Sequence, residues 1–99
     1  MKKAEIQKRL AKLLRAHPEH DHISRVSLFG SQLHGTAKTG SDIDLLIEFN
    51  EPISMFTLVR MERDMSKALG IHVDLSTPNS LSKYFRSDVI ETAEPIFEQ

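Results

Sequence analysis

The chain contains no cysteine, and no apolar run in it approaches the length of a membrane span. The first absence excludes disulfides and cysteine-ligated metal sites, and it is compatible with a reducing compartment. The second excludes a membrane-spanning helix, which needs about 20 predominantly apolar residues. Charged residues such as Glu5, Lys8 and Arg9 interrupt any apolar core of a secretory signal. We therefore expect a cytoplasmic protein.

The chain also has little excess of charge of either sign, with a net charge of −1 at neutral pH. No overall field attracts a polyanion, so we expect no direct nucleic-acid binding. The charges are nevertheless unevenly distributed, because residues 1–15 are rich in Lys and Arg whereas residues 87–99 carry acidic residues and no basic ones. The simpler interpretation is solvated faces, and the alternative is a docking surface for a charged partner.

The length and composition are those of one small globular domain. The 99 residues are 39% hydrophobic and 27% charged, and they leave no room for a second core. We see no repeats, linkers or low-complexity segments, so we assign residues 1–99 to a single domain.

Hydrophobic periodicity predicts helices covering a small sheet. Apolar residues recur at helical spacing from about Lys2 to Ala16, and again in a helix with Ser54 as N-cap and Gly70 as its C-terminal stop. Short β-branched and apolar runs predict strands. The predicted strands are 23–29, 43–49, 71–75 and 95–97, and the predicted short helices are 80–85 and 88–93, the latter with a capping box formed by Asp88 and Glu91. This order indicates an α/β fold with a long functional loop over residues 30–41.

Carboxylates gather on the predicted sheet. Asp42 and Asp44 are two residues apart where a strand opens, so they share one face of it. Asp74 alternates with Val73 and Leu75 and emerges opposite the buried face of a later strand. If a helical crossover makes these strands neighbours, the carboxylates meet. Clustered carboxylates repel unless a cation lies between them, and hard oxygen ligands suit Mg²⁺ or Mn²⁺.

Gly30 and Ser31 follow the first predicted strand directly. Glycine allows a tight turn, and exposed backbone N–H groups there bind phosphate well, with the Ser31 hydroxyl as a further donor. A Gly-Ser turn or an Asp-x-Asp pair alone is weak evidence, since each is common in ordinary turns. Together, a phosphate-binding turn beside carboxylates that bind a divalent cation describes a nucleoside triphosphate site.

The pattern from Gly30-Ser31 to Ser41-Asp42-Ile43-Asp44-Leu45, with Val73-Asp74-Leu75 beyond it, resembles the minimal nucleotidyltransferases of the DNA polymerase β-like superfamily. The resemblance covers essentially the whole chain and implies their fold, a small mixed β-sheet flanked by helices. It also implies that Asp42, Asp44 and Asp74 are the metal-binding catalytic residues, that Gly30 and Ser31 hold the nucleotide, and that Mg²⁺ and ATP are used.

Members of this family are small partners of HEPN-domain proteins, and they often act as antitoxins of HEPN ribonuclease toxins, in the HEPN/MNT toxin–antitoxin systems. The resemblance therefore implies a hetero-oligomer with a HEPN toxin and transfer of AMP to a toxin tyrosine, with Asp74 assisting removal of the hydroxyl proton. The chain departs from the family in one segment. Gln32 and His34 stand where members often carry arginine, and guanidinium groups are not replaced conservatively by these side chains.

Other functions and sites are open at this point. A non-catalytic antitoxin would neutralise its partner by contact alone, and an enzyme that modifies a small molecule would need a further helical domain.

Other possible metal ligands lie between the first helix and the first strand, namely His17, His20 and His22, with Glu19 and Asp21. We interpret them as a solvated loop. His72 shares the predicted face of Asp74. Tyr84 is interpreted as covering the core, or as a partner contact if it is exposed.

Overall fold

The computed structural model describes residues 2–30 and 42–99, in which helices and strands alternate along the chain. The loop predicted over residues 30–41, with Ser31, Gln32 and His34, lies outside the described residues apart from Gly30. The elements are α1 (Lys3–Ala16), η1 (His20–His22), β1 (Ile23–Phe29), β2 (Ile43–Phe49), α3 (Met55–Leu69), β3 (Val73–Ser76), η2 (Pro78–Ser80), α4 (Arg86–Thr92) and β4 (Glu94–Glu98).

The strands form one mixed sheet in the order β3-β2-β1-β4. Strand β1 is antiparallel to both of its neighbours, and β2 is parallel to β3. Because α3 connects β2 to β3, these elements make the crossover unit that the sequence predicted. The adjacency of the strands bearing Asp44 and Asp74 is thereby confirmed.

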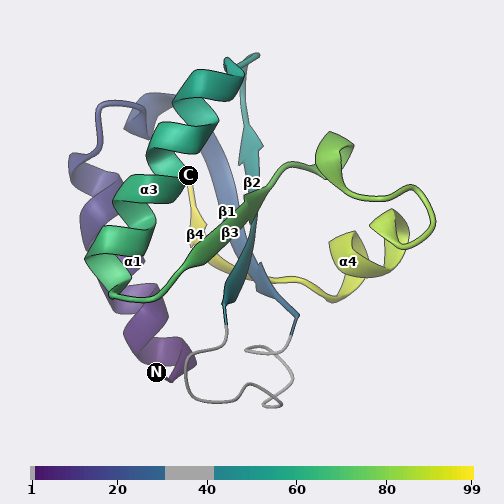
Figure 1. Ribbon diagram of the computed structural model, residues 1–99, viewed down its shortest axis with the longest axis horizontal. Helices are drawn as coiled ribbons and strands as arrows, with labels where there is room; N and C mark the ends of the chain where they lie inside the picture. Colours follow the sequence, from purple (N-terminus) through teal and green to yellow (C-terminus); the bar gives the residue numbers. More distant parts are fainter. Residues whose placement is uncertain (1, 31–41) are drawn as a thin grey trace.

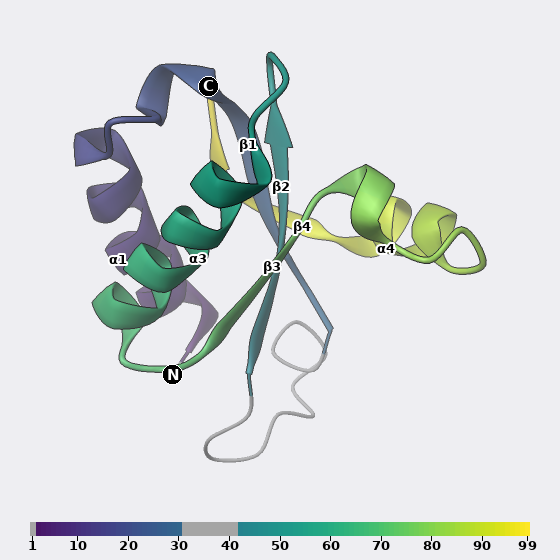
Figure 2. The same cartoon turned by 45° about the horizontal axis from the view of Figure 1, so that its top comes forward.

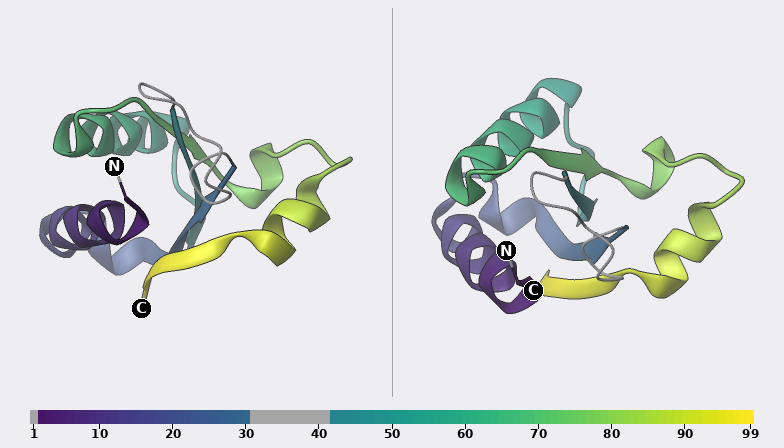
Figure 3. Two further views of the ribbon diagram at one scale, coloured as in Figure 1. Left: turned by 90° about the horizontal axis from the view of Figure 1, so that it is seen from below. Right: turned by 60° about the horizontal axis from the view of Figure 1, so that its bottom comes forward.

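The helices are distributed unequally over the two faces of the sheet (Figure 1). Helices α1 and α3 lie side by side against one face, whereas α4 lies on the opposite side (Figure 3). Figure 2 also shows α1 and α3 on one side of the strands and α4 on the other. One face of the sheet is thus fully covered, and the other is left partly open.

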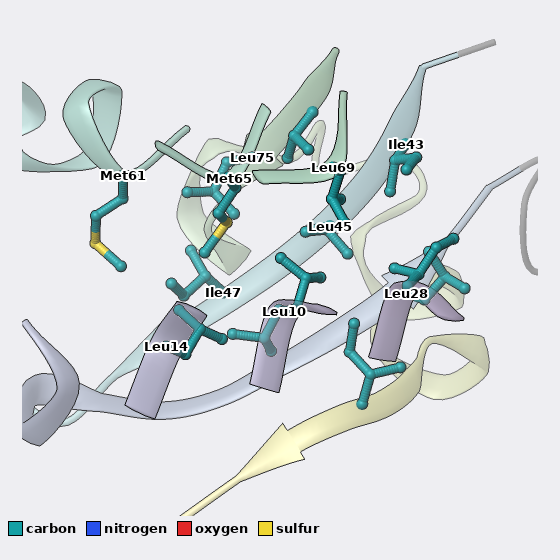
Figure 4. Close-up of a cluster of buried hydrophobic side chains, with 14 of the residues drawn as sticks. Leu10, Leu14, Leu28, Ile43, Leu45, Ile47, Met61, Met65, Leu69 and Leu75 are labelled. Atoms are coloured by element: carbon teal, nitrogen blue, oxygen red, sulfur yellow. The ribbon is translucent and has the colours of Figure 1, made fainter. Parts of the chain in front are cut away.

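The hydrophobic core fills the space between the sheet and the α1–α3 layer (Figure 4). Alternate residues of β2 and β3 supply it, together with residues of β1 and β4 and one stripe each from α1 and α3, as the periodicity predicted. Its fully buried members include Ile6, Leu10 and Leu14 of α1, Ile43, Leu45 and Ile47 of β2, Met61 of α3 and Val73 of β3. Burial of the odd-numbered residues of β2 directs its even-numbered residues to the opposite face.

The predicted ends of α3 are confirmed. The Ser54 hydroxyl accepts a hydrogen bond from the Thr57 backbone N–H at 3.2 Å, which satisfies a free amide of the first turn. Gly70 ends the helix with φ +70°, a left-handed conformation that favours glycine. None of the helices in the described ranges is both long and apolar enough to cross a membrane.

The segment after β3 differs from its prediction. Residues 80–85 are not a helix, because a 3₁₀ turn ends at Ser80 and α4 begins only at Arg86. The Arg86 guanidinium donates to the Leu81 carbonyl at 3.1 Å and holds the intervening residues as a turn. Asp88 therefore lies inside the first turn of α4, and Phe85 occupies the N-cap position without a side-chain hydrogen bond. The predicted capping box of Asp88 and Glu91 is wrong.

Candidate active site

Two aspartates lie side by side on the open face of the sheet. Asp44 of β2 and Asp74 of β3 are direct partners in the parallel register. Their chain neighbours Ile43, Leu45 and Val73 are fully buried toward α1 and α3, so both carboxylates point away from those helices. The strand register brings together two aspartates that are separated by 29 residues in the sequence.

Asp42 precedes β2 and joins this pair from the same face, since it lies two residues before Asp44. We call Asp42, Asp44 and Asp74 the aspartate cluster. Asp42 and Asp74 are exposed, and Asp44 is partly buried. Within residues 2–30 and 42–99, no group of three or more acidic and histidine side chains is gathered tightly enough to hold a metal ion as it stands. The aspartates lie near the same end of the sheet without converging on one point.

The electrostatics of the cluster are those of unneutralised like charges. Burial raises the pKa of the Asp44 carboxyl above its ordinary value, and the negative charges of Asp74 and Asp42 raise this pKa further. The ionised form of Asp44 is therefore less favourable in the folded protein than in water. A divalent cation would relieve both effects, and a set of carboxylate oxygens is the donor set that Mg²⁺ and Mn²⁺ prefer.

Gly30 completes this end of the sheet, because Asp44 lies against its backbone. Gly30 has φ +79°, and a β-carbon built on it would lie 2.4 Å from Asp44 Oδ2. A β-carbon at this position would therefore displace the Asp44 carboxylate. Glycine suits the position both because it favours the left-handed turn after β1 and because it leaves the space that the Asp44 carboxylate occupies. Ser31, the other predicted phosphate ligand, lies outside the described residues.

Side chains of α3 fix the strand that carries Asp74. Strand β3 is at the edge of the sheet, so the backbone N–H groups of Val73 and Leu75 have no strand partner on their outer side. Ser66 Oγ accepts from Val73 N at 2.9 Å, and Glu62 Oε2 accepts from Leu75 N at 2.8 Å. These positioning residues were missed by the sequence analysis. Their i, i+4 spacing places them on one side of α3, but it does not indicate that this side accepts hydrogen bonds from β3.

His72 lies at the rim of the cluster, as its predicted face suggested. Its Nδ1 is 3.2 Å from Asp42 Oδ2, and both side chains are more than half exposed. The other predicted histidines lie elsewhere, at the opposite end of β1.

The segment from His17 to His22 is only partly the solvated loop that was predicted. His17 Nε2 lies 3.0 Å from Asp64 Oδ2, and the His17 side chain is 6% exposed, so it joins the end of α1 to α3. His22 lies between Glu19 and Glu51, with each of its ring nitrogens 2.9 Å from one carboxylate. Its pKa is raised above 6.5 by the hydrogen bond with Glu19 and by the charges of Glu51, Glu19 and Asp21. These residues form structural contacts between neighbouring segments of the chain.

The fold and the cluster together define a class of protein. A mixed sheet covered on one face by α1 and α3, with paired aspartates at one end of the other face, is the arrangement that the resemblance to minimal nucleotidyltransferases implies. A family model for the nucleotidyltransferase domain matches residues 6–95. The chain belongs to this family.

Individual relatives agree with this assignment. MJ1217 of Methanocaldococcus jannaschii is 38% identical over 88 residues, covering 89% of this chain and 90% of the relative. The protein adenylyltransferase MntA of Thermococcus cleftensis is 32% identical over 68 residues, covering 69% of each chain. A chain in the structure of a tri-AMPylated Shewanella oneidensis HEPN toxin in complex with MNT antitoxin has a TM-score of 0.70 and 21% identity. That match covers 97% of this chain and 72% of the other, and at this identity it is a likeness of fold.

Proposed function

We propose that this chain is a Mg²⁺-dependent nucleotidyltransferase that transfers AMP from ATP to a tyrosine hydroxyl of a HEPN toxin and thereby acts as its antitoxin. The observation that carries the proposal is the register pairing of Asp44 with Asp74, with Asp42 on the same face. Membership of the nucleotidyltransferase-domain family supports the reaction type.

In this proposal the aspartate cluster holds the divalent cation, Mg²⁺ or Mn²⁺. The donor set fits, because its oxygens are hard ligands, and because burial and the neighbouring charges of Asp74 and Asp42 raise the pKa of Asp44. When bound, the cation neutralises charge on the triphosphate and polarises the reacting oxygens. Gly30 keeps a side chain out of the space beside Asp44.

The chain's own residues have distinct roles in the proposed reaction. The acceptor oxygen attacks the α-phosphorus of ATP, the bond from that phosphorus to the bridging oxygen breaks, and pyrophosphate leaves. The hydroxyl proton passes to Asp74, which is exposed on the open face where an acceptor can approach. Gly30 and Ser31 hold phosphate oxygens through backbone N–H groups and the serine hydroxyl.

The names of related proteins support the identity of the partner. The relative from Thermococcus cleftensis is named a protein adenylyltransferase, and the Shewanella oneidensis complex contains an AMPylated HEPN toxin with an MNT antitoxin. By analogy, this chain forms a hetero-oligomer with a HEPN toxin. The partner presents its tyrosine to the open face of the sheet, which neither α1 nor α3 covers (Figure 3).

The test is the intact mass of both proteins after incubation of the chain with its HEPN partner, ATP and Mg²⁺. We expect the partner to gain the mass of at least one AMP. The double variant Asp42→Asn/Asp44→Asn should give no gain. The matched control Asp88→Asn/Glu91→Gln removes the same charge from exposed positions of α4 and should behave as the wild type.

A different outcome would identify the alternative function. If the partner gains no mass, and if Asp42→Asn/Asp44→Asn still neutralises it, the transfer reaction is refuted. The chain would then be an antitoxin that acts by binding alone on a nucleotidyltransferase fold.

A further inference from the structure

The parallel register that pairs Asp44 with Asp74 extends one step beyond the strands. Ile43 is the partner of Val73, and the preceding residues, Asp42 and His72, are therefore neighbours as well. The Ile43 backbone N–H donates to the His72 carbonyl at 3.0 Å, which fixes the two chain segments at this point. His72 thus occupies a defined place beside the aspartate cluster.

His72 provides the basic contact to the cluster. Its Nδ1 lies 3.2 Å from Asp42 Oδ2, and within residues 2–30 and 42–99 no Lys, Arg or other His forms an ion pair with Asp42, Asp44 or Asp74. The two side chains are 62% and 57% exposed, so packing alone does not hold either of them. Among the described residues, this contact with His72 is therefore what restrains the Asp42 carboxylate.

We propose that His72 is a positioning residue for the divalent-cation site, and this inference rests on the proposed function. In this proposal Nδ1 carries the proton and donates it to Oδ2, which restrains the Asp42 carboxylate beside Asp44 and Asp74. An exposed carboxylate otherwise loses rotational freedom when it binds a cation, and partners that orient ligands reduce that loss. Removing such a partner weakens metal affinity by about 10–100-fold.

The choice of substitutions separates this role from a general effect of the imidazole. In His72→Asn, the side-chain amide nitrogen stands at the same position along the side chain as Nδ1 and can donate to Asp42. In His72→Gln that nitrogen is one bond further out, near the place of Nε2. His72→Ala removes the donor altogether. His22→Ala is the matched control, because His22 is a similarly half-exposed histidine with carboxylate contacts, remote from the cluster.

The measurement is calorimetric titration of each variant with Mn²⁺ in the presence of a non-hydrolysable ATP analogue. We expect His72→Ala to bind Mn²⁺ about 10–100-fold more weakly than the wild type. His72→Asn should recover most of the affinity, His72→Gln less, and His22→Ala should bind as the wild type does. Thermal unfolding without metal confirms that each variant is folded.

The outcomes distinguish this inference from the function on which it rests. If wild type and His72→Ala bind Mn²⁺ equally while Asp44→Asn does not bind it, His72 has no positioning role and the metal site stands. Equal affinity of His72→Ala and His72→Asn, both weakened, would also overturn the role assigned to the Nδ1 donor. If the wild type binds no Mn²⁺, both the inference and the metal site are refuted.

Discussion

Two groups of acidic and histidine side chains lie at opposite ends of the β1–β2 pair, and their charges are arranged in opposite ways. At one end, His22 lies between Glu19 and Glu51, and each of its ring nitrogens has a carboxylate at 2.9 Å. At the other end, Asp44 and Asp74 face each other across neighbouring strands. The same residue types make a paired network at one end and a repulsive cluster at the other.

The pKa values express this difference. The pKa of His22 is raised because neighbouring carboxylates stabilise its charged form, whereas the pKa of Asp44 is raised because burial and like charges destabilise its charged form. The His22 network is complete without any further component. In the proposed function a cation offsets the charges of the aspartate cluster, which is why we assign function to that end of the sheet and structure to the other.

The largest effect is expected from removing charge at the cluster. Asp44→Asn should reduce AMP transfer by about 100-fold or more, since even the loss of an outer partner of a metal ligand costs about 10–100-fold. Without metal, the variant should be at least as stable as the wild type at neutral pH, because the raised pKa makes ionised Asp44 unfavourable in the folded state. Transfer rates and thermal unfolding in EDTA measure the two effects. A clear loss of stability in EDTA would show that Asp44 has a structural role instead.

A smaller loss of activity is expected from filling the space beside Asp44. Gly30→Ala places a β-carbon 2.4 Å from Asp44 Oδ2, so the carboxylate must move, and metal affinity should fall by about 10–100-fold. Gly70→Ala is the matched control, because Gly70 has a similar positive φ of +70° with nothing within 4 Å of the added carbon. Both substitutions should lower stability by about 1–2 kcal/mol through backbone strain. Equal metal affinity in the two variants would show that the contact at Gly30 is unimportant.

The next effect concerns the strand that carries Asp74. Glu62→Ala removes the acceptor for the Leu75 backbone N–H, and it should cost about 1–3 kcal/mol of unfolding free energy. Glu62→Gln keeps an acceptor oxygen at the same place and should retain most of that stability. Urea unfolding gives the free energies, and hydrogen exchange of the Leu75 amide reports the strand itself. Unchanged exchange in Glu62→Ala would mean that the edge of β3 is protected in another way.

The smallest effect is expected at the paired end of the sheet. The folded-state pKa of His22 is raised, so its contribution to stability is fully present below pH 6.5 and is lost as the pH rises through the folded-state pKa. His22→Gln should therefore be less stable than the wild type at pH 6, and the gap should narrow toward pH 8. The effect is small, because the pairs are exposed and screened by solvent. A gap in melting temperature that does not change with pH would contradict the pairing.

Much of the fold could be predicted because its signals are local. The strands at 23–29 and 43–49 match β1 and β2, and the cap at Ser54 and the stop at Gly70 match the ends of α3. Alternation in the strands also placed Asp44 and Asp74 on the face opposite the core. Each of these features depends on a few consecutive residues, so a single sequence carries them.

What could not be predicted depends on residues far apart in the chain. Nothing near Glu62 or Ser66 indicates that they accept from β3, and nothing near His17 indicates Asp64 as its partner. The prediction for residues 80–85 was wrong for the same reason, since carbonyls that a helix would use are bonded to the Arg86 side chain instead. The contact of His72 with Asp42 likewise follows from the register of two strands.

The most direct test of the aspartate cluster as the catalytic centre is a crystal structure of the chain with Mn²⁺ and a non-hydrolysable ATP analogue. We predict an anomalous difference peak for Mn²⁺ at about 2.0–2.2 Å from carboxylate oxygens of Asp42 and Asp44, with Asp74 facing the α-phosphate. The triphosphate should lie beside Gly30. A nucleotide bound elsewhere on the surface, with no metal peak at these carboxylates, would contradict the assignment of the cluster to nucleotidyl transfer.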